Sequence, residues 1–146
     1  MPLPRPHPGL VICYEFLWGH EHQAGMTQGE KRRPCVIVLA VKHQRGDTIV
    51  TVAPVTHTAL RDPRHGVEIP RRLKDFLGLD QARSWVIATD LNEFIWPGDH
   101  VFPIPGGRVD QYDYGTVPQS MLTMINERIE KLAEGYVHRI PRDLDY

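Results

Sequence analysis

Hydrophobic residues along the chain fall into short runs separated by turn-forming residues, a pattern typical of β structure. The first run covers residues 9–18, the second 34–42 and the third 48–54. A polar turn at 44–47 separates the second run from the third, and strands joined by so short a turn pair in antiparallel fashion. We therefore expect a β-hairpin over residues 34–54.

Further short runs predict strands over residues 67–69, 84–91 and 101–104. A helical turn at 71–77 lies between the first two of these strands and ends at a glycine. The polar stretch 19–32 contains three glycines, and we expect it to be a long loop.

The longest helical pattern spans residues 118–134. Pro118 suits the first turn of a helix, Gly135 lies where a C-terminal cap belongs, and an apolar stripe runs between them. The stripe consists of Met121, Leu122, Ile125, Ile129, Leu132 and Ala133. About five short strands and a terminal helix predict a mainly β fold, a barrel-like antiparallel sheet with the helix packed on it.

The 146 residues fit one domain, which we place at 9–134, between an extended proline-rich arm at 1–8 and a polar tail at 135–146. The net charge is −1, so a site for a polyanion has to be local. The N-terminal residues lack the apolar segment of a signal peptide, and no run is long enough to span a membrane. We expect a cytoplasmic protein whose Cys13 and Cys35 are reduced and buried.

A cluster of positive charge lies at the start of the second strand, in the sequence Lys31-Arg32-Arg33-Pro34. Proline fixes its own backbone and extends the residue before it, so Arg33 is expected on a rigid strand entry. A guanidinium held there loses little entropy when it binds an anion. Neighbouring side chains on a strand point to opposite sides, so Arg32 and Arg33 face different surroundings. Arg33 is a catalytic candidate, and Lys31 and Arg32 are substrate-binding candidates; plain solvated charge is the alternative.

The third strand ends in polar side chains, Thr56, His57 and Thr58. In an antiparallel hairpin the end of one strand lies beside the start of the other, so these residues are expected near Arg33. Imidazole titrates close to neutral pH and suits proton transfer, which makes His57 a catalytic candidate. A polar strand end that faces water is the alternative.

Two other clusters carry less weight. His20-Glu21-His22 contains metal-ligating side chains, but alternating residues in a glycine-bearing loop form no ready cage, and we predict neither a metal nor another cofactor. Solvated charge, with a phosphate backbone as a possible ligand, is our interpretation of a second cationic group. This group consists of Arg61, Arg64, His65, Arg71, Arg72 and Lys74.

In order and spacing, several segments resemble the PemK/MazF family, the ribonuclease toxins of toxin–antitoxin pairs. The matching segments are Gly9-Leu10-Val11, Arg33-Pro34 before Val36-Ile37-Val38-Leu39, Val52-Ala53-Pro54-Val55-Thr56, Val67-Glu68-Ile69, Gly78-Leu79, Ser84-Trp85-Val86-Ile87 and the terminal helix. The resemblance implies a small SH3-like barrel that forms a homodimer. It also implies metal-independent, sequence-specific cleavage of single-stranded RNA that leaves a 2′,3′-cyclic phosphate, and a cognate antitoxin protein as partner.

By position, Arg33 matches the family's catalytic arginine and Thr56 the threonine that supports it. Leu10 stands where the family usually has an acidic residue, and the first loop is longer than usual. The family's Glu-Gln in that loop has two possible counterparts here, Glu21 with Gln23 or Gln28 with Glu30. Of these, Glu21, Gln23 and Glu30 are substrate-binding candidates. The general base is therefore open, and His57 is an added candidate for it.

The resulting expectation is a homodimeric endoribonuclease. Two other functions fit the same barrel: binding of a protein target without catalysis, as in the gyrase-poison relatives of this fold, and RNA binding without cleavage. For the dimer, Trp85, Phe94 and Trp96 supply aromatic rings suited to the core of an interface.

Overall fold

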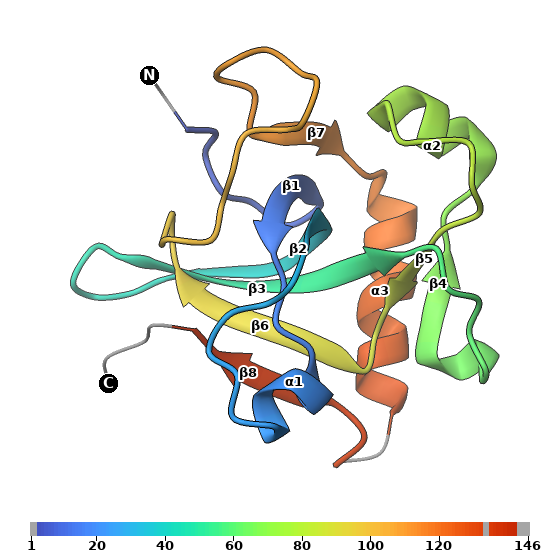
Figure 1. The fold of residues 1–146 in the computed structure, drawn as a ribbon, viewed down its shortest axis with the longest axis horizontal. Coiled ribbons are helices and arrows are strands. Elements are labelled where there is room, and N and C mark those ends of the chain that lie inside the picture. Colours follow the sequence, from blue (N-terminus) through green and yellow to red (C-terminus); the bar gives the residue numbers. More distant parts are fainter. Residues whose placement is uncertain (1–2, 133–134, 143–146) are drawn as a thin grey trace.

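Eight strands form a curled, mainly antiparallel sheet in the computed structural model, which describes residues 3–132 and 135–142 (Figure 1). The strands are β1 (Leu10–Glu15), β2 (Arg32–Lys42), β3 (Thr48–Thr56), β4 (Gly66–Glu68), β5 (Trp85–Ile87), β6 (Asp90–Ile95), β7 (Asp113–Thr116) and β8 (His138–Pro141). The helices are α1 (Gly19–Gln23), α2 (Arg71–Leu77) and α3 (Gln119–Lys131), with a 3-10 turn at Pro63–His65. The expected mainly β fold with a C-terminal helix is confirmed.

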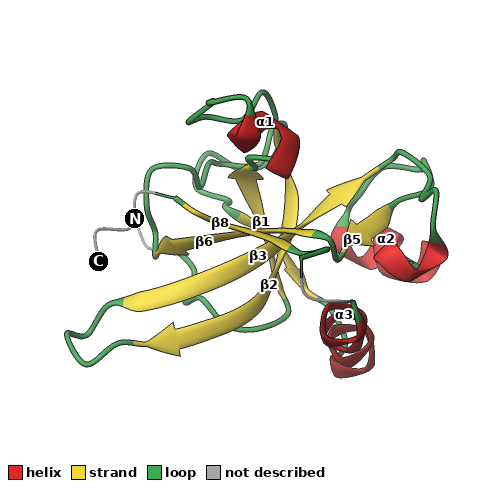
Figure 2. Cartoon of the chain, turned by 90° about the horizontal axis from the view of Figure 1, so that it is seen from below, coloured by secondary structure: helices red, strands yellow, loops and turns green. Residues whose placement is uncertain are grey.

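β3 is the central strand, because it pairs with three others. It forms the predicted hairpin with β2, from Cys35 opposite Pro54 to Lys42 opposite Thr48. The first half of β3 also pairs with β6, and its last two residues pair with β5. The main strand order of the sheet is β4-β5-β3-β2-β1-β7. Outside this order, β6 pairs with β3, and β8 pairs with β6 in parallel (Figure 2).

Apolar side chains form two core clusters. One includes Val11 of β1 and Ile125 of α3, and it attaches the terminal helix to the sheet. The other includes Ile12 and is rich in aromatic rings, with Tyr14 stacked on Phe94 at 4.8 Å between ring centroids. β1 contributes to both clusters because neighbouring side chains on a strand point to opposite faces.

The helical turn at α2 agrees with expectation, and the terminal helix is present. α3 ends at Lys131 with Leu132 as its C-cap, so the expected cap at Gly135 is wrong. Gly78 ends α2 with a φ of 70°, in the left-handed region that favours glycine. The expected strand 84–91 is wrong in its extent, because a bend at 88–89 divides it into β5 and the start of β6. The expected strand 101–104 is reduced to one bridge, between Val101 and Tyr14.

Three elements differ from the sequence expectation: α1 inside the expected loop, β7, and β8 in the expected tail. The Trp18 N–H donates to Oε1 of Glu21 at 2.9 Å, which closes the first turn of α1. In β8 only Ile140 is buried, so the sequence of this strand lacks the alternation of apolar and polar residues that predicts a strand. The expected helix residues 133–134 and the tail residues 143–146 lie outside the described residues.

The aromatic residues expected at an interface are packed inside the fold. Phe94 is 1% exposed and Trp85 is 9% exposed, and Trp96 packs against the aromatic cluster. The expectation that Phe94 and Trp85 form an interface core is therefore wrong, whereas Trp96 is half-buried. Cys13 and Cys35 are free and buried, as expected. No helix in the described ranges is long and apolar enough to cross a membrane.

Candidate functional site

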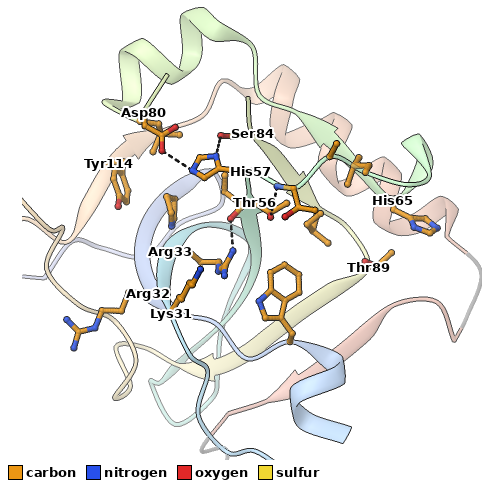
Figure 3. Close-up of a pocket in the computed structure, with 18 of the residues that line it drawn as sticks. Lys31, Arg32, Arg33, Thr56, His57, His65, Asp80, Ser84, Thr89 and Tyr114 are labelled. Atoms are coloured by element: carbon orange, nitrogen blue, oxygen red, sulfur yellow. Dashed lines mark hydrogen bonds and ion pairs between the residues drawn. The ribbon is translucent and has the colours of Figure 1, made fainter. Parts of the chain in front are cut away.

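The start of β2 and the end of β3 meet at a cavity of about 880 Å³ (Figure 3). The hairpin register brings these two strand ends together, because Cys35 pairs with Pro54. The candidates that line the cavity are Lys31, Arg32, Arg33, Thr56, His57 and Thr58. The predicted convergence of the two polar clusters is thus confirmed.

Arg33 extends into this cavity from the second residue of β2. Its Nη1 donates to the carbonyl oxygen of Val55 at 3.4 Å, and its Cζ lies 5.1 Å from the centre of the Trp18 ring. Its Nε is buried and has no hydrogen-bond partner in the described part of the chain. A guanidinium carries five N–H donors, so Arg33, which lines the cavity, keeps Nη donors for an anion beyond the one bonded to Val55.

Arg32 and Arg33 point in different directions, as the strand geometry predicts (Figure 3). The guanidinium of Arg32 stacks on Phe102, with Cζ 3.6 Å from the ring centroid. Lys31 is exposed at the rim of the cavity. Arg33 is therefore the cation aimed at the interior, and its two neighbours supply positive charge at the edge.

His57 is held on both sides of its ring. Its Nε2 lies 2.9 Å from Oδ2 of Asp80, and the two side chains are 56% and 58% exposed. Its Nδ1 lies 3.0 Å from Oγ of Ser84 and 3.2 Å from the carbonyl oxygen of Arg83. The imidazole is thus fixed at the mouth of the cavity, beside Thr56 (Figure 3).

Lys74 lies behind the His57–Asp80 pair, with its side chain only 5% exposed, so its assignment to solvated charge is wrong. Its Nζ donates to Oγ of Ser84 at 2.9 Å and contacts Oδ1 of Asp80 at 3.3 Å. Partial desolvation opposes ionisation of Asp80, but the hydrogen bond from Lys74 and the neighbouring His57 outweigh it and lower the pKa of this carboxyl. Asp80 is therefore a carboxylate at neutral pH.

Asp80, His57 and Ser84 are the residue types of a hydrolase triad, but Ser84 is not placed as a nucleophile. Its side chain is 1% exposed, and its hydroxyl donates to the carbonyl oxygen of Ala82 while accepting from Lys74. A substrate atom cannot reach a buried oxygen that is engaged in this way. Ser84 instead orients the imidazole.

Three predicted substrate-binding residues do not line the cavity. Glu21 is 5% exposed and serves α1, whereas Gln23 and Glu30 are exposed elsewhere on the segment between β1 and β2. Two members of the second cationic group, Arg61 and His65, do line the cavity. The structure thus joins the two cationic regions that the sequence presents separately.

No set of three or more His, Cys, Asp or Glu side chains among the described residues is arranged to hold a metal ion. The site residues that sequence reasoning missed are Asp80 and Ser84, together with Lys74 behind them. The only local signal is that Lys74 falls between Leu73 and Leu77, which both pack in the core. Comparison with protein-family models and with curated proteins finds no match for the chain.

Proposed function

We propose that this protein is a metal-independent endoribonuclease that cleaves single-stranded RNA at specific sequences and leaves a 2′,3′-cyclic phosphate. The observation that carries the proposal is the placement of Arg33, which is fixed on a strand and lines the same cavity as Thr56. Thr56 lies on the paired strand. The resemblance of both positions to the PemK/MazF toxins supports the same reaction.

The proposed reaction forms one bond and breaks another at phosphorus. The ribose 2′ oxygen attacks the adjacent phosphorus, the bond to the 5′ oxygen breaks, a base takes the 2′-hydroxyl proton and an acid protonates the 5′ oxygen. Negative charge grows on the other phosphate oxygens. The guanidinium of Arg33 and the hydroxyl of Thr56 supply donors for this charge. His57 and Asp80 are the titratable pair available for proton transfer.

The hydroxyl of Thr56 is oriented for this task. Its Oγ1 accepts a hydrogen bond from the N–H of Thr58 at 3.1 Å. The hydroxyl proton stays available for another acceptor, and in the proposed complex this acceptor is a phosphate oxygen beside Arg33.

The charge and shape of the cavity favour an unpaired nucleic acid strand. Lys31, Arg32 and Arg61 bring positive charge to it in a chain whose net charge is −1. The rings of Trp18 and Tyr114 also line it and offer surfaces on which unstacked bases can pack. RNA rather than DNA follows from the reaction itself, because the 2′-hydroxyl is the nucleophile.

We extend the proposal to two protein partners, a second copy of the chain and an antitoxin with a flexible acidic segment. The cationic rim of Lys31 and Arg32 is complementary to such a segment. A neighbouring gene that encodes a small acidic-tailed protein supports the antitoxin, and its absence together with harmless expression contradicts it. Sedimentation at micromolar concentration measures the oligomeric state, and a persistent monomer contradicts the homodimer.

The purified protein is incubated with mixed single-stranded RNA in EDTA, and the product ends are identified. We expect cleavage at a short motif with 2′,3′-cyclic phosphate ends. The matched control is the same RNA with one 2′-deoxynucleotide at the cut site, which must resist cleavage. RNA that is bound but never cut indicates an RNA-binding module, and a protein that neither binds nor cuts RNA overturns the proposal.

A further inference from the structure

Arg142 follows β8 directly, and its side chain is 3% exposed. Its Nη1 donates to the carbonyl oxygen of Glu15 at 2.9 Å and to Oδ1 of Asn92 at 3.0 Å. Its Nη2 lies 3.4 Å from the carbonyl oxygen of Thr27 and 3.2 Å from the ring nitrogens of His100. A guanidinium is buried only where such partners replace water, so these contacts join four separate parts of the chain.

Arg142 and β6 together hold the β1–β2 segment, which we define as residues 16–31. Arg142 contacts it directly at Thr27 and indirectly through Oδ1 of Asn92, which accepts from both Arg142 and Leu17. Near its start, Leu17 N donates to Oδ1 of Asn92 at 3.0 Å, and Nδ2 of the same Asn92 donates to Leu17 O at 2.8 Å. Gly19 N donates to Oδ2 of Asp90 at 2.7 Å. Arg142 reaches the other side of the segment at Thr27. The segment is therefore fastened to β6 and to the residue after β8.

This fastening shapes one wall of the cavity. Trp18, His20 and Lys31 line the cavity from the β1–β2 segment, and the ring of Trp18 faces Arg33. Arg33 and Thr56, by contrast, are held by the pairing of β2 with β3. The wall and the candidate catalytic pair thus have different structural supports.

The structure assigns to Arg142 the role of a positioning residue: with β8 it forms a clasp that holds the β1–β2 segment in the position that binds RNA. This inference rests on the proposed ribonuclease function for its kinetic consequence. Loss of the clasp releases the Trp18 wall and weakens substrate binding, while Arg33 and Thr56 keep their places for the chemical step.

The full-length Arg142→Gln variant tests this inference beside Arg139→Gln, which removes an exposed cation from the same strand. Amide hydrogen exchange is measured in the β1–β2 segment, and RNA cleavage kinetics are measured in parallel. We expect faster exchange in the segment and a KM raised roughly 10- to 100-fold with kcat close to that of the wild type, because loss of one base-stacking contact at Trp18 weakens binding by this order. Arg139→Gln should match the wild type in both measurements.

Arg142→Lys, which keeps the charge but lacks the planar fork, gives the decisive comparison where Arg142→Gln does not fold. Wild-type exchange in the segment of a folded Arg142 variant overturns the clasp, and so does a loss confined to kcat. A wild-type protein that does not cleave RNA overturns the proposed function alone, since the exchange comparison still decides whether Arg142 holds the segment.

Discussion

Nζ of Lys74 lies 2.9 Å from Oγ of Ser84, behind the wall of the cavity rather than at its surface. An exposed polar contact such as that of His57 with Asp80 is weakly held on its own, because water competes for both partners. Here the buried Lys74 contacts Asp80, and Ser84 contacts His57. The orientation of the imidazole therefore depends on two buried residues, Lys74 and Ser84.

Lys74→Met should destabilise the protein and reduce RNA cleavage. The substitution fills a similar volume but leaves Ser84 and Asp80 without their donor, and loss of a hydrogen-bond partner at a buried polar group such as the Ser84 hydroxyl costs about 1–3 kcal/mol. Denaturant unfolding measures the free energy of unfolding. Arg83→Gln is the control, because the Arg83–Glu68 pair is exposed and contributes little. Equal effects of the two variants would contradict the role given to Lys74.

Arg33→Ala should lower the rate of RNA cleavage by roughly 10²–10³-fold, the loss seen when one preorganised charge-stabilising group is removed. Arg33→Lys should also cleave poorly, because an ammonium group cannot reproduce the planar fork. Arg32→Ala should keep the cleavage rate and weaken RNA binding, mainly at low salt. Single-turnover cleavage and binding at two salt concentrations separate these outcomes. A variant Arg33→Ala that cleaves like the wild type would sink the assignment.

Asp80 should contribute to stability in a pH-dependent way. Its pKa is lower in the folded protein than the ordinary value of 3.8, so its contribution is present above that value and is lost as pH falls through the folded pKa. The difference in Tm between the wild type and Asp80→Asn should therefore shrink below about pH 4. Asp75→Asn, at an exposed aspartate of α2, controls for the loss of one charge. A difference that grows toward low pH would be the wrong sign.

Cys13 and Cys35 should resist thiol reagents in the native protein. Burial raises the pKa of both thiols, and Cys35 is affected more strongly, so the reactive thiolate is scarce at neutral pH. Labelling with a chromogenic disulfide reagent should proceed at the rate of unfolding and become immediate in denaturant. Rapid labelling of native protein would show that the strands carrying these residues open readily.

What the sequence predicts well depends on how local the responsible contacts are. The β2–β3 hairpin is visible because a short polar turn separates two apolar runs, and the placement of Arg33 near Thr56 follows from it. β8 pairs with β6, which is far away in the sequence. Its one buried residue, Ile140, is too little to show the alternation of apolar and polar residues typical of a strand. Asp80 enters the site only through the packing of α2 against the sheet. Tertiary contacts of this kind leave no mark in a local pattern.

Arg142 remains invisible in the sequence for a related reason. A single cation in a polar stretch ordinarily faces water, and only the fold reveals its partners at Glu15, Thr27 and Asn92. Lys74 is likewise a buried cation whose partners, Ser84 and Asp80, only the fold reveals. Buried cations are thus the features for which sequence reasoning was least informative in this chain.

The β2–β3 hairpin also has a consequence for the order in which the molecule assembles. Arg33 and Thr56 belong to neighbouring strands joined by one short turn, and closing so short a loop costs little chain entropy. The parallel pairing of β6 with β8 requires a much longer stretch of chain to close. We therefore expect the groups proposed for chemistry to come together early and locally, and the wall proposed to receive RNA to be completed last, when the end of the chain is fastened in place.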